Sequence, residues 1–279
     1  MVLTAHAKIN LTLEVLGKRA DGFHEIRSVM QRITLADTLT IERAQDLILS
    51  CSDPGLEGPE NLVWRAAELL RGECGVSDGA ALGLEKRIPV AAGLGGGSSD
   101  AATALRGLNE LWGLRLSGER LRELGARLGS DVPFFLLESG CALAEGRGER
   151  LMPLAPLPAW WVVLVKPDVG ISAAAAYEAL RREDWSTGFA TSRWLAYARA
   201  SGRLPNPVNG LEEAALRAAP AAAAAKRALA EVGARSMAMS GSGSTYFALA
   251  EREEEADQMA ERVRATGWRQ VWTAGFVTL

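Results

Sequence analysis

The sequence predicts an α+β fold in two domains, and three observations support this prediction. Residues 5–15 alternate strictly between apolar and polar side chains, which indicates a β-strand. A glycine-rich segment at 93–97 lies between a strand-like and a helix-like pattern. Three prolines between 150 and 160 break any regular element, and the order of strands and helices changes after them. We therefore expect a first domain over residues 1–152, which carries the glycine-rich loop, and a second over 153–279.

The composition limits the classes of function. Of 279 residues, 48% are hydrophobic and 23% charged, as in soluble globular proteins, and the net charge of −3 gives no general attraction to nucleic acid or anionic lipid. No apolar run reaches the roughly 18 residues of a membrane helix. Three dispersed cysteines and two histidines offer neither a disulfide framework nor a histidine-based metal site. We expect a cytoplasmic protein that binds small molecules, with no nucleic acid and no membrane as partner.

The alternating strand at 5–15 places Lys8 and Asn10 on the same face, roughly 6.6 Å apart along the strand. The opposite face is apolar from Ala5 to Val15 and should be buried. Alternation alone favours a polar face exposed to solvent. The pattern by itself is therefore no evidence for a functional role of Lys8.

The other elements of the first domain follow from similar patterns. Helical spacing and local start and stop signals predict a helix that Ser117 begins and Gly129 ends. The further expected elements are strands at 42–53 and 81–90 and helices at 59–74 and 101–112.

The second domain reads as strand, helices, two strands, helix, strand. This is the order of a split βαβ, ferredoxin-like unit. Pro220 should restart the helix in the alanine-rich stretch. The expected elements are strands at 160–167 and 268–279, a strand pair within 235–250, and helices at 172–180, 211–233 and 251–267.

The glycine-rich segment predicts a phosphate-binding loop. The N–H groups at the start of a helix lack partners and bind anions, and glycines let the backbone approach a ligand closely. We expect Ser98 or Ser99 to cap the helix or to donate to a phosphate oxygen. The loop fits neither the Walker pattern, because no Gly-Lys-Ser/Thr ends it, nor the dinucleotide pattern, because Asp100 takes the place of the last glycine.

The segment PVAAGLGGGSSDAA at 89–102 resembles the phosphate loop of the GHMP kinases, whose signature is close to P-x3-G-L-G-S/G-S-S-A. Other stretches resemble the branch of this family that phosphorylates diphosphocytidyl-methylerythritol, and they occur in the family's order: HAKINL, RADGFH, PENLVW, GSDVPFF and SGSGSTYF. Two positions differ from the usual pattern, since His6 replaces a proline and Phe23 a tyrosine.

The resemblance implies a two-domain GHMP kinase fold, with a ribosomal-protein-S5-like N-terminal domain and a ferredoxin-like C-terminal domain. It also implies ATP-dependent phosphorylation, with Mg²⁺, of the 2-hydroxyl of the cytidine diphosphate-linked polyol in non-mevalonate isoprenoid synthesis. The implied catalytic pair is Lys8 and Asp131. The residues implied around ATP are Pro89, Val90, Ala91, Ala92, Gly93, Leu94, Gly95, Gly96, Gly97, Ser98, Ser99, Asn61 and Lys86. Those implied around the substrate are Asn10, Phe23, His24, Tyr177, Gly241 and Ser242.

Several alternatives stay open. Asp131 lies in Ser-Asp-Val-Pro, which is also good turn chemistry. Asp100, in what should be the first turn of the helix, either favours the helix dipole or helps Ser98 or Ser99 to hold Mg²⁺. The chain could be another GHMP kinase, of mevalonate or homoserine type, or a non-catalytic nucleotide-binding regulator. The presence of both Lys8 and Asp131 argues against a regulator, which needs no general base.

Overall fold

The computed structural model describes residues 1–278, and the chain forms two compact units. The first unit comprises Met1–Ala7, Ala36–Pro89 and Gly95–Glu138. The second comprises Lys8–Leu35, Val90–Leu94 and the chain from Ser139 onward. Each unit gathers segments from separate parts of the sequence, so the units do not correspond to two continuous halves of the chain. The boundary expected at 152/153 therefore stays a prediction.

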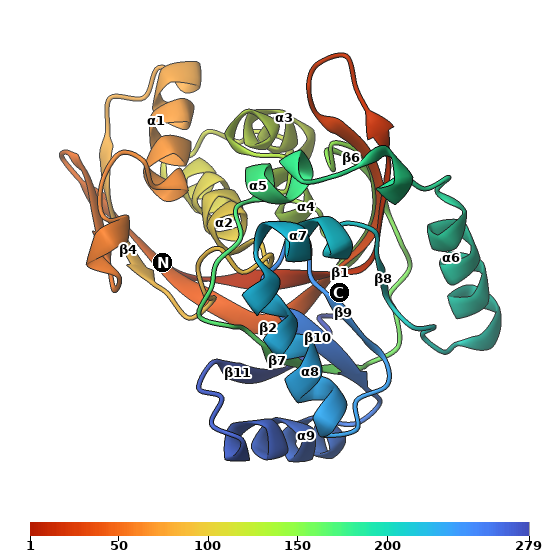
Figure 1. The fold of residues 1–279 in the computed structure, drawn as a ribbon. Coiled ribbons are helices and arrows are strands. Elements are labelled where there is room, and N and C mark those ends of the chain that lie inside the picture. Colours follow the sequence, from red (N-terminus) through yellow and green to blue (C-terminus); the bar gives the residue numbers. More distant parts are fainter. Residues whose placement is uncertain (279) are drawn as a thin grey trace. The chain divides into compact units, whose positions relative to one another are not determined.

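The first unit combines strands with a group of helices. Strand β4 pairs antiparallel with the second half of β2 and parallel with β3. Helices α1, α2 and α3 contact one another, and α4 contacts α2 and α3 (Figure 1). The bounds are β2 His24–Ala44, β3 Leu47–Cys51, β4 Gly79–Glu85, η1 Pro54–Leu56, α1 Leu62–Cys74, α2 Gly96–Leu111, α3 Gly118–Leu128 and α4 Val132–Phe135.

Local signals define these helices, with one exception. The Ser117 side chain accepts the Arg120 N–H at the start of α3, and Gly129 ends the helix as expected. Helix α2 differs, because it begins at Gly96 after Gly95 in the left-handed region, and no side chain caps it. The expected cap by Ser98 or Ser99 is therefore wrong, since both residues already lie inside the helix.

The second unit contains strands on both sides of the proline-rich segment. Strand β1 pairs with β8, the first half of β2 pairs with β5, and β5 pairs with β6. Neither the β5–β6 hairpin nor α6 was predicted. The bounds are β1 Val2–Lys18, β5 Cys141–Gly146, β6 Arg150–Pro153, β7 Trp161–Val165, α5 Ala173–Glu178, η2 Arg182–Asp184, α6 Phe189–Ser201, β8 Val208–Asn209, α7 Glu212–Ala218, η3 Pro220–Ala222, α8 Ala223–Glu231, β9 Met237–Met239, β10 Tyr246–Ala250, α9 Glu253–Ala265 and β11 Val271–Gly275.

The expected strand and helix order of the second domain is confirmed. Strands β11, β7, β10 and β9 form an antiparallel sheet in that spatial order, as in a split βαβ unit. Helices α8 and α9 contact each other and pack on this sheet (Figure 1). Pro220 opens the short helix η3 and separates α7 from α8, as predicted.

The polar face of β1 is buried, not solvated. Lys8, Asn10, Thr12 and Glu14 are all at most 4% exposed. The solvated reading is therefore wrong, because the structure covers both faces of the strand. Burying polar groups is costly unless each is hydrogen-bonded, so this face identifies a built polar site.

Glu14 shows how one end of this buried face is satisfied. Its carboxylate accepts the Ser186 hydroxyl at 2.8 Å and the Thr191 N–H at 2.7 Å. Burial acts to raise the pKa of Glu14, but these hydrogen bonds outweigh it and leave the pKa below its usual value of 4.5. The ionised form of Glu14 therefore stabilises the second unit.

The substitution Glu14→Gln should lower the free energy of unfolding by about 1–3 kcal/mol at pH 7, because hydrogen bonds to a buried charge are lost. The folded-state pKa is depressed, so the stabilisation is complete above the unfolded pKa and disappears as pH falls through about 4.5 and below. Thermal unfolding between acidic and neutral pH should therefore show a shallower pH dependence in the variant. Glu231→Gln, at an exposed position, is the control; an unchanged pH slope in Glu14→Gln would contradict the role of Glu14.

Candidate active site

The start of α2 presents bare backbone in the first unit. Gly95 adopts φ +70° immediately before the helix, where a side chain would be strained. A Cβ atom on Gly96 would lie 2.9 Å from Cγ2 of Ile88, and one on Gly97 would lie 3.5 Å from Cδ1 of Leu62. Glycine therefore lets α2 pack directly on Ile88, just after β4, and on α1, while its first N–H groups have no partner within the helix. This arrangement is suited to bind a phosphate.

Lys86 lies beneath this helix start and is paired with two carboxylates. Its ammonium group donates to Oδ2 of Asp37 and to Oδ2 of Asp100, the latter at 2.7 Å. Asp100 is the fifth residue of α2, not part of its first turn, and it is 2% exposed. The expectation that Asp100 favours the helix dipole is therefore wrong, because the carboxylate faces Lys86 instead.

Two further predicted residues belong to the first unit. Asn61 caps α1 by accepting the Val63 N–H at 2.9 Å. Asp131 immediately precedes α4 and makes no capping hydrogen bond there. A Cβ atom on Gly129 would lie 3.8 Å from Oγ of Ser98, so the turn that carries Asp131 passes close to the first turn of α2.

The second unit holds the remainder of the glycine-rich loop and Lys8. The Lys8 N–H donates to the Leu94 carbonyl at 3.0 Å, which attaches the loop to β1. The Lys8 ammonium donates to Oδ1 of Asn10 at 2.6 Å, and Asn10 donates to the Ser28 hydroxyl at 2.7 Å. The Lys8 side chain is thus oriented by a buried polar chain that runs from β1 to β2.

A second glycine turn lies against this group. The Ser240 hydroxyl donates to the Gly93 carbonyl at 2.9 Å. Gly241 has φ +56°, and a Cβ atom there would lie 3.3 Å from both the Lys8 ammonium and Oδ1 of Asn10. Asn209 anchors this turn, because its side-chain amide donates to the carbonyls of Met239 and Gly241 at 2.7 and 2.8 Å.

Aromatic side chains gather near the β1–β2 turn. The rings of His24 and Tyr177 stack at 5.2 Å with an interplanar angle of 21°. The Phe23 ring is 50% exposed, and the Arg147 guanidinium lies over it at 4.5 Å. Burial, and then the charge of Lys18, lower the pKa of His24, which favours the neutral imidazole that can both donate and accept.

The structure thus gathers the predicted residues in two groups. The first unit holds Asn61, Lys86, Pro89, Gly95–Ser99 and Asp131, and the second holds Lys8, Asn10, Phe23, His24, Val90–Leu94, Tyr177, Gly241 and Ser242. Sequence reasoning missed Asp37 and Asn209. The contacts that matter here join each of them to residues about 30 or more positions away, so no local pattern indicates that role.

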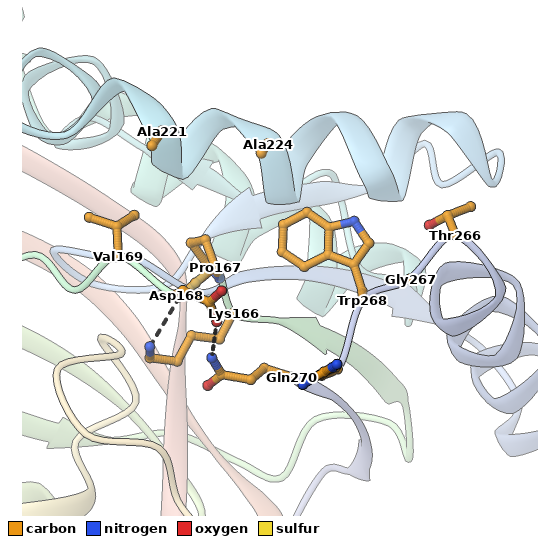
Figure 2. Close-up of a pocket in the computed structure, with 11 residues that line it drawn as sticks. Lys166, Pro167, Asp168, Val169, Ala221, Ala224, Thr266, Gly267, Trp268 and Gln270 are labelled. Carbon is orange, nitrogen blue, oxygen red and sulfur yellow. Dashed lines mark hydrogen bonds between the residues drawn. The ribbon is translucent and has the colours of Figure 1, made fainter.

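A separate cavity lies elsewhere in the second unit. It has a volume of about 530 Å³, and Lys166, Pro167 and Trp268 are among its lining residues (Figure 2). None of the predicted site residues lines it. Within residues 1–278, no three His, Cys, Asp or Glu side chains cluster as a metal site would require. The helices of the same residues include none with the length and apolar character to cross a membrane.

Comparison with known proteins places these groups in context. Two family descriptions match the sequence: GHMP kinases N terminal domain over residues 61–139 and GHMP kinases C terminal over residues 176–267. A protein of Pelotomaculum thermopropionicum, named 4-diphosphocytidyl-2-C-methyl-D-erythritol kinase, is 47% identical over 274 residues, which cover 95% of both chains. A protein of Geobacter sulfurreducens with the same name is 43% identical over 96% of both chains.

Solved structures of GHMP kinases also match this chain. A crystal structure of 4-(cytidine 5'-diphospho)-2C-methyl-D-erythritol kinase matches with a TM-score of 0.85 at 40% identity and covers 99% of both chains. A mevalonate kinase structure matches with a TM-score of 0.72 at 12% identity and covers 100% of both chains. At that identity the second match shows a shared fold alone. These matches confirm the predicted two-domain α+β fold.

The substitution Gly93→Ala tests the contact between the two glycine turns of the second unit. Gly93 has φ +73°, and an added Cβ atom would lie 2.0 Å from the Ser240 carbonyl oxygen, so the backbone must move. Gly202→Ala is a matched control, because Gly202 has φ +64° and nothing lies within 4 Å of its Cβ position. We expect Gly93→Ala to lower the unfolding temperature clearly more than the control, which carries only the strain of about 1–2 kcal/mol for a left-handed residue. Equal shifts in calorimetry would show that the turns are not in close contact.

Proposed function

Because this chain belongs to the GHMP kinase family, we propose that it transfers the γ-phosphoryl group of ATP to the 2-hydroxyl of 4-diphosphocytidyl-2-C-methyl-D-erythritol. This reaction is a step of the non-mevalonate route to isoprenoid precursors. The observation that carries the proposal is the identity of 40–47% to proteins of that name over 95–99% of the chain. The chain is therefore an ATP-dependent small-molecule kinase with an alcohol group as acceptor.

The backbone of the glycine-rich loop supports the ATP part of the proposal. The N–H groups at the start of α2 meet the negative charge of the phosphates without any lysine in the loop itself. Asn61 belongs to the same unit as the helix start, where the nucleotide would contact it, and Lys86, whose ammonium is held by Asp37 and Asp100, would support the helix start from beneath.

Mg²⁺ would enter this site with the phosphates of ATP. Asp100, the acid closest to the loop in sequence, is buried and paired with Lys86, so it does not fit the role of a metal ligand. Mg²⁺ commonly keeps several waters and binds mainly through substrate phosphates. When bound there, it would neutralise part of their charge.

In the proposed chemistry, Asp131 accepts the proton of the substrate hydroxyl and Lys8 offsets the developing charge. An alcohol hydroxyl is a far weaker acid than a carboxylic acid, so a carboxylate cannot take its proton before the phosphoryl group begins to transfer. Asp131 therefore cannot form an alkoxide in advance, and the proton leaves late, as the loose phosphoryl transition state forms. Most of the acceleration must then come from alignment and fixed dipoles.

The substrate part of the proposal uses the aromatic group of the second unit. A cytosine ring would stack on Phe23 or Tyr177, and the neutral His24 would hydrogen-bond to its edge. Asn10, Gly241 and Ser242 would contact the polyol and diphosphate, because Gly241 lies directly against Lys8 and Asn10.

A direct assay tests the function. ATP consumption should depend on 4-diphosphocytidyl-2-C-methyl-D-erythritol and remain at background with mevalonate, homoserine or galactose. Phosphorus NMR of the product should show a new phosphomonoester at the 2-position. Preferential turnover of mevalonate or homoserine would assign the chain to another branch of the family, and ATP binding without turnover of any acceptor would indicate a regulator.

The substitution Asp131→Asn separates the proton acceptor from ATP binding. The amide cannot take the hydroxyl proton, so we expect kcat to fall by about 10²–10⁴-fold, the range for a general base. The Kd for ATP should stay within a few-fold of the parent, because Asp131 does not contact the phosphates in this proposal. Asp257→Asn, at an exposed position of α9, is the control for an Asp-to-Asn change. Near-normal turnover in Asp131→Asn would remove Asp131 from the chemistry.

A further inference from the structure

A buried carboxylate on β2 holds the segment that follows β4 in the first unit. Asp37 is 0% exposed, and its Oδ1 atom accepts the N–H groups of Arg87 and Ile88, the latter at 2.8 Å. Its Oδ2 atom accepts the ammonium group of Lys86. One side chain therefore fixes three consecutive residues, 86–88, by charge-assisted hydrogen bonds.

Two of these residues, Lys86 and Ile88, lie beneath the start of α2. A Cβ atom on Gly96 would lie 3.3 Å from the Lys86 ammonium and 2.9 Å from Cγ2 of Ile88. The ammonium also reaches Asp100 in the second turn of the helix. Lys86 thus connects β2 to α2, and any displacement of 86–88 would move the first N–H groups of the helix.

We propose that Asp37 is a positioning residue for ATP, which acts through Lys86 and Ile88 on the start of α2. The inference rests on the proposed function, in which this helix start binds the phosphates. Hydrogen bonds to phosphate oxygens require correct distance and angle, so a shift of the helix start weakens ATP binding without any loss of a direct contact. The polyol substrate has no part in this arrangement.

The two carboxylates around Lys86 are not equivalent. Asp37 uses both of its oxygens, whereas Oδ1 of Asp100 has no hydrogen-bond partner within residues 1–278. Burial, and then the nearby charge of Asp37, raise the pKa of Asp100 to about 7 against the opposing effect of Lys86. The ionised Asp100 is therefore costly to bury, and an amide can replace it, since its single bond to Lys86 needs only one acceptor oxygen.

The test compares Asp37→Asn with Asp100→Asn. In Asp37→Asn the amide nitrogen faces the Lys86 ammonium, a repulsive pair of donors, or the amide flips and no longer accepts from Arg87 and Ile88. We expect both the KM and the calorimetric Kd for ATP to rise about tenfold, with the KM for the acceptor unchanged, as for the loss of a charged hydrogen bond. Asp100→Asn should change neither constant by more than about twofold, and Glu85→Gln, an exposed neighbour, is the surface control.

Parent-like ATP affinity in Asp37→Asn, or equal damage in Asp100→Asn, would overturn the proposal. Should Asp37→Asn not fold, Asp37→Glu keeps the charge but moves the acceptor by one methylene, and it must also weaken ATP binding. The calorimetry contains no acceptor, so it reports on Asp37 even when the enzyme assay fails. An absence of turnover by the parent, with ATP still bound, would refute the proposed function and leave this comparison intact.

Discussion

The candidate site depends on holding bare backbone in place. Four of the five residues at 93–97 are glycines, so apart from the buried Leu94 the loop has no side chains to anchor it, and the other anchors come from neighbouring elements. In the second unit, the N–H of Lys8 and the hydroxyl of Ser240 bind the carbonyls of Leu94 and Gly93. In the first unit, the packing of Gly96 on Ile88 has the same effect. A phosphate loop without a lysine therefore requires neighbours that are rigid and polar.

Buried charge is the cost of this rigidity. Lys8, Glu14, Asp37, Lys86 and Asp100 are all largely withdrawn from water, and each has at least one hydrogen bond. Such groups stabilise a fold less than apolar residues of the same size would. Their value lies in the orientation they impose: Asp37 and Asp100 fix the Lys86 ammonium beneath α2, and Glu14 fixes the start of α6.

Much of this fold could be predicted from the sequence, because its elements carry local signals: the alternation along β1, Ser117 before α3 and Pro220 between α7 and α8. The start of α2 was harder to predict. Ser98 and Ser99 are residue types that often cap helices, but here the left-handed conformation of Gly95 alone precedes the helix, and no side chain caps it. The buried polar face of β1 and the role of Asp37 could not be predicted. Both features depend on which other elements pack against a strand. The periodicity of apolar residues shows which face of a strand is apolar, but it does not show what covers the polar face.

The aromatic group shows how far a single replaced residue constrains recognition of a flat base. Phe23 stands where the family has tyrosine, so it cannot donate a hydrogen bond, but stacking requires only its ring. Arg147 covers one face of that ring, and half of the side chain remains exposed for a ligand. In the proposed function, polar recognition of the base comes from His24, whose imidazole stacks on Tyr177 and has a lowered pKa that favours its neutral form. The stacking surface and the hydrogen-bonding edge would then be supplied by different residues, so a phenylalanine at position 23 would leave both functions in place.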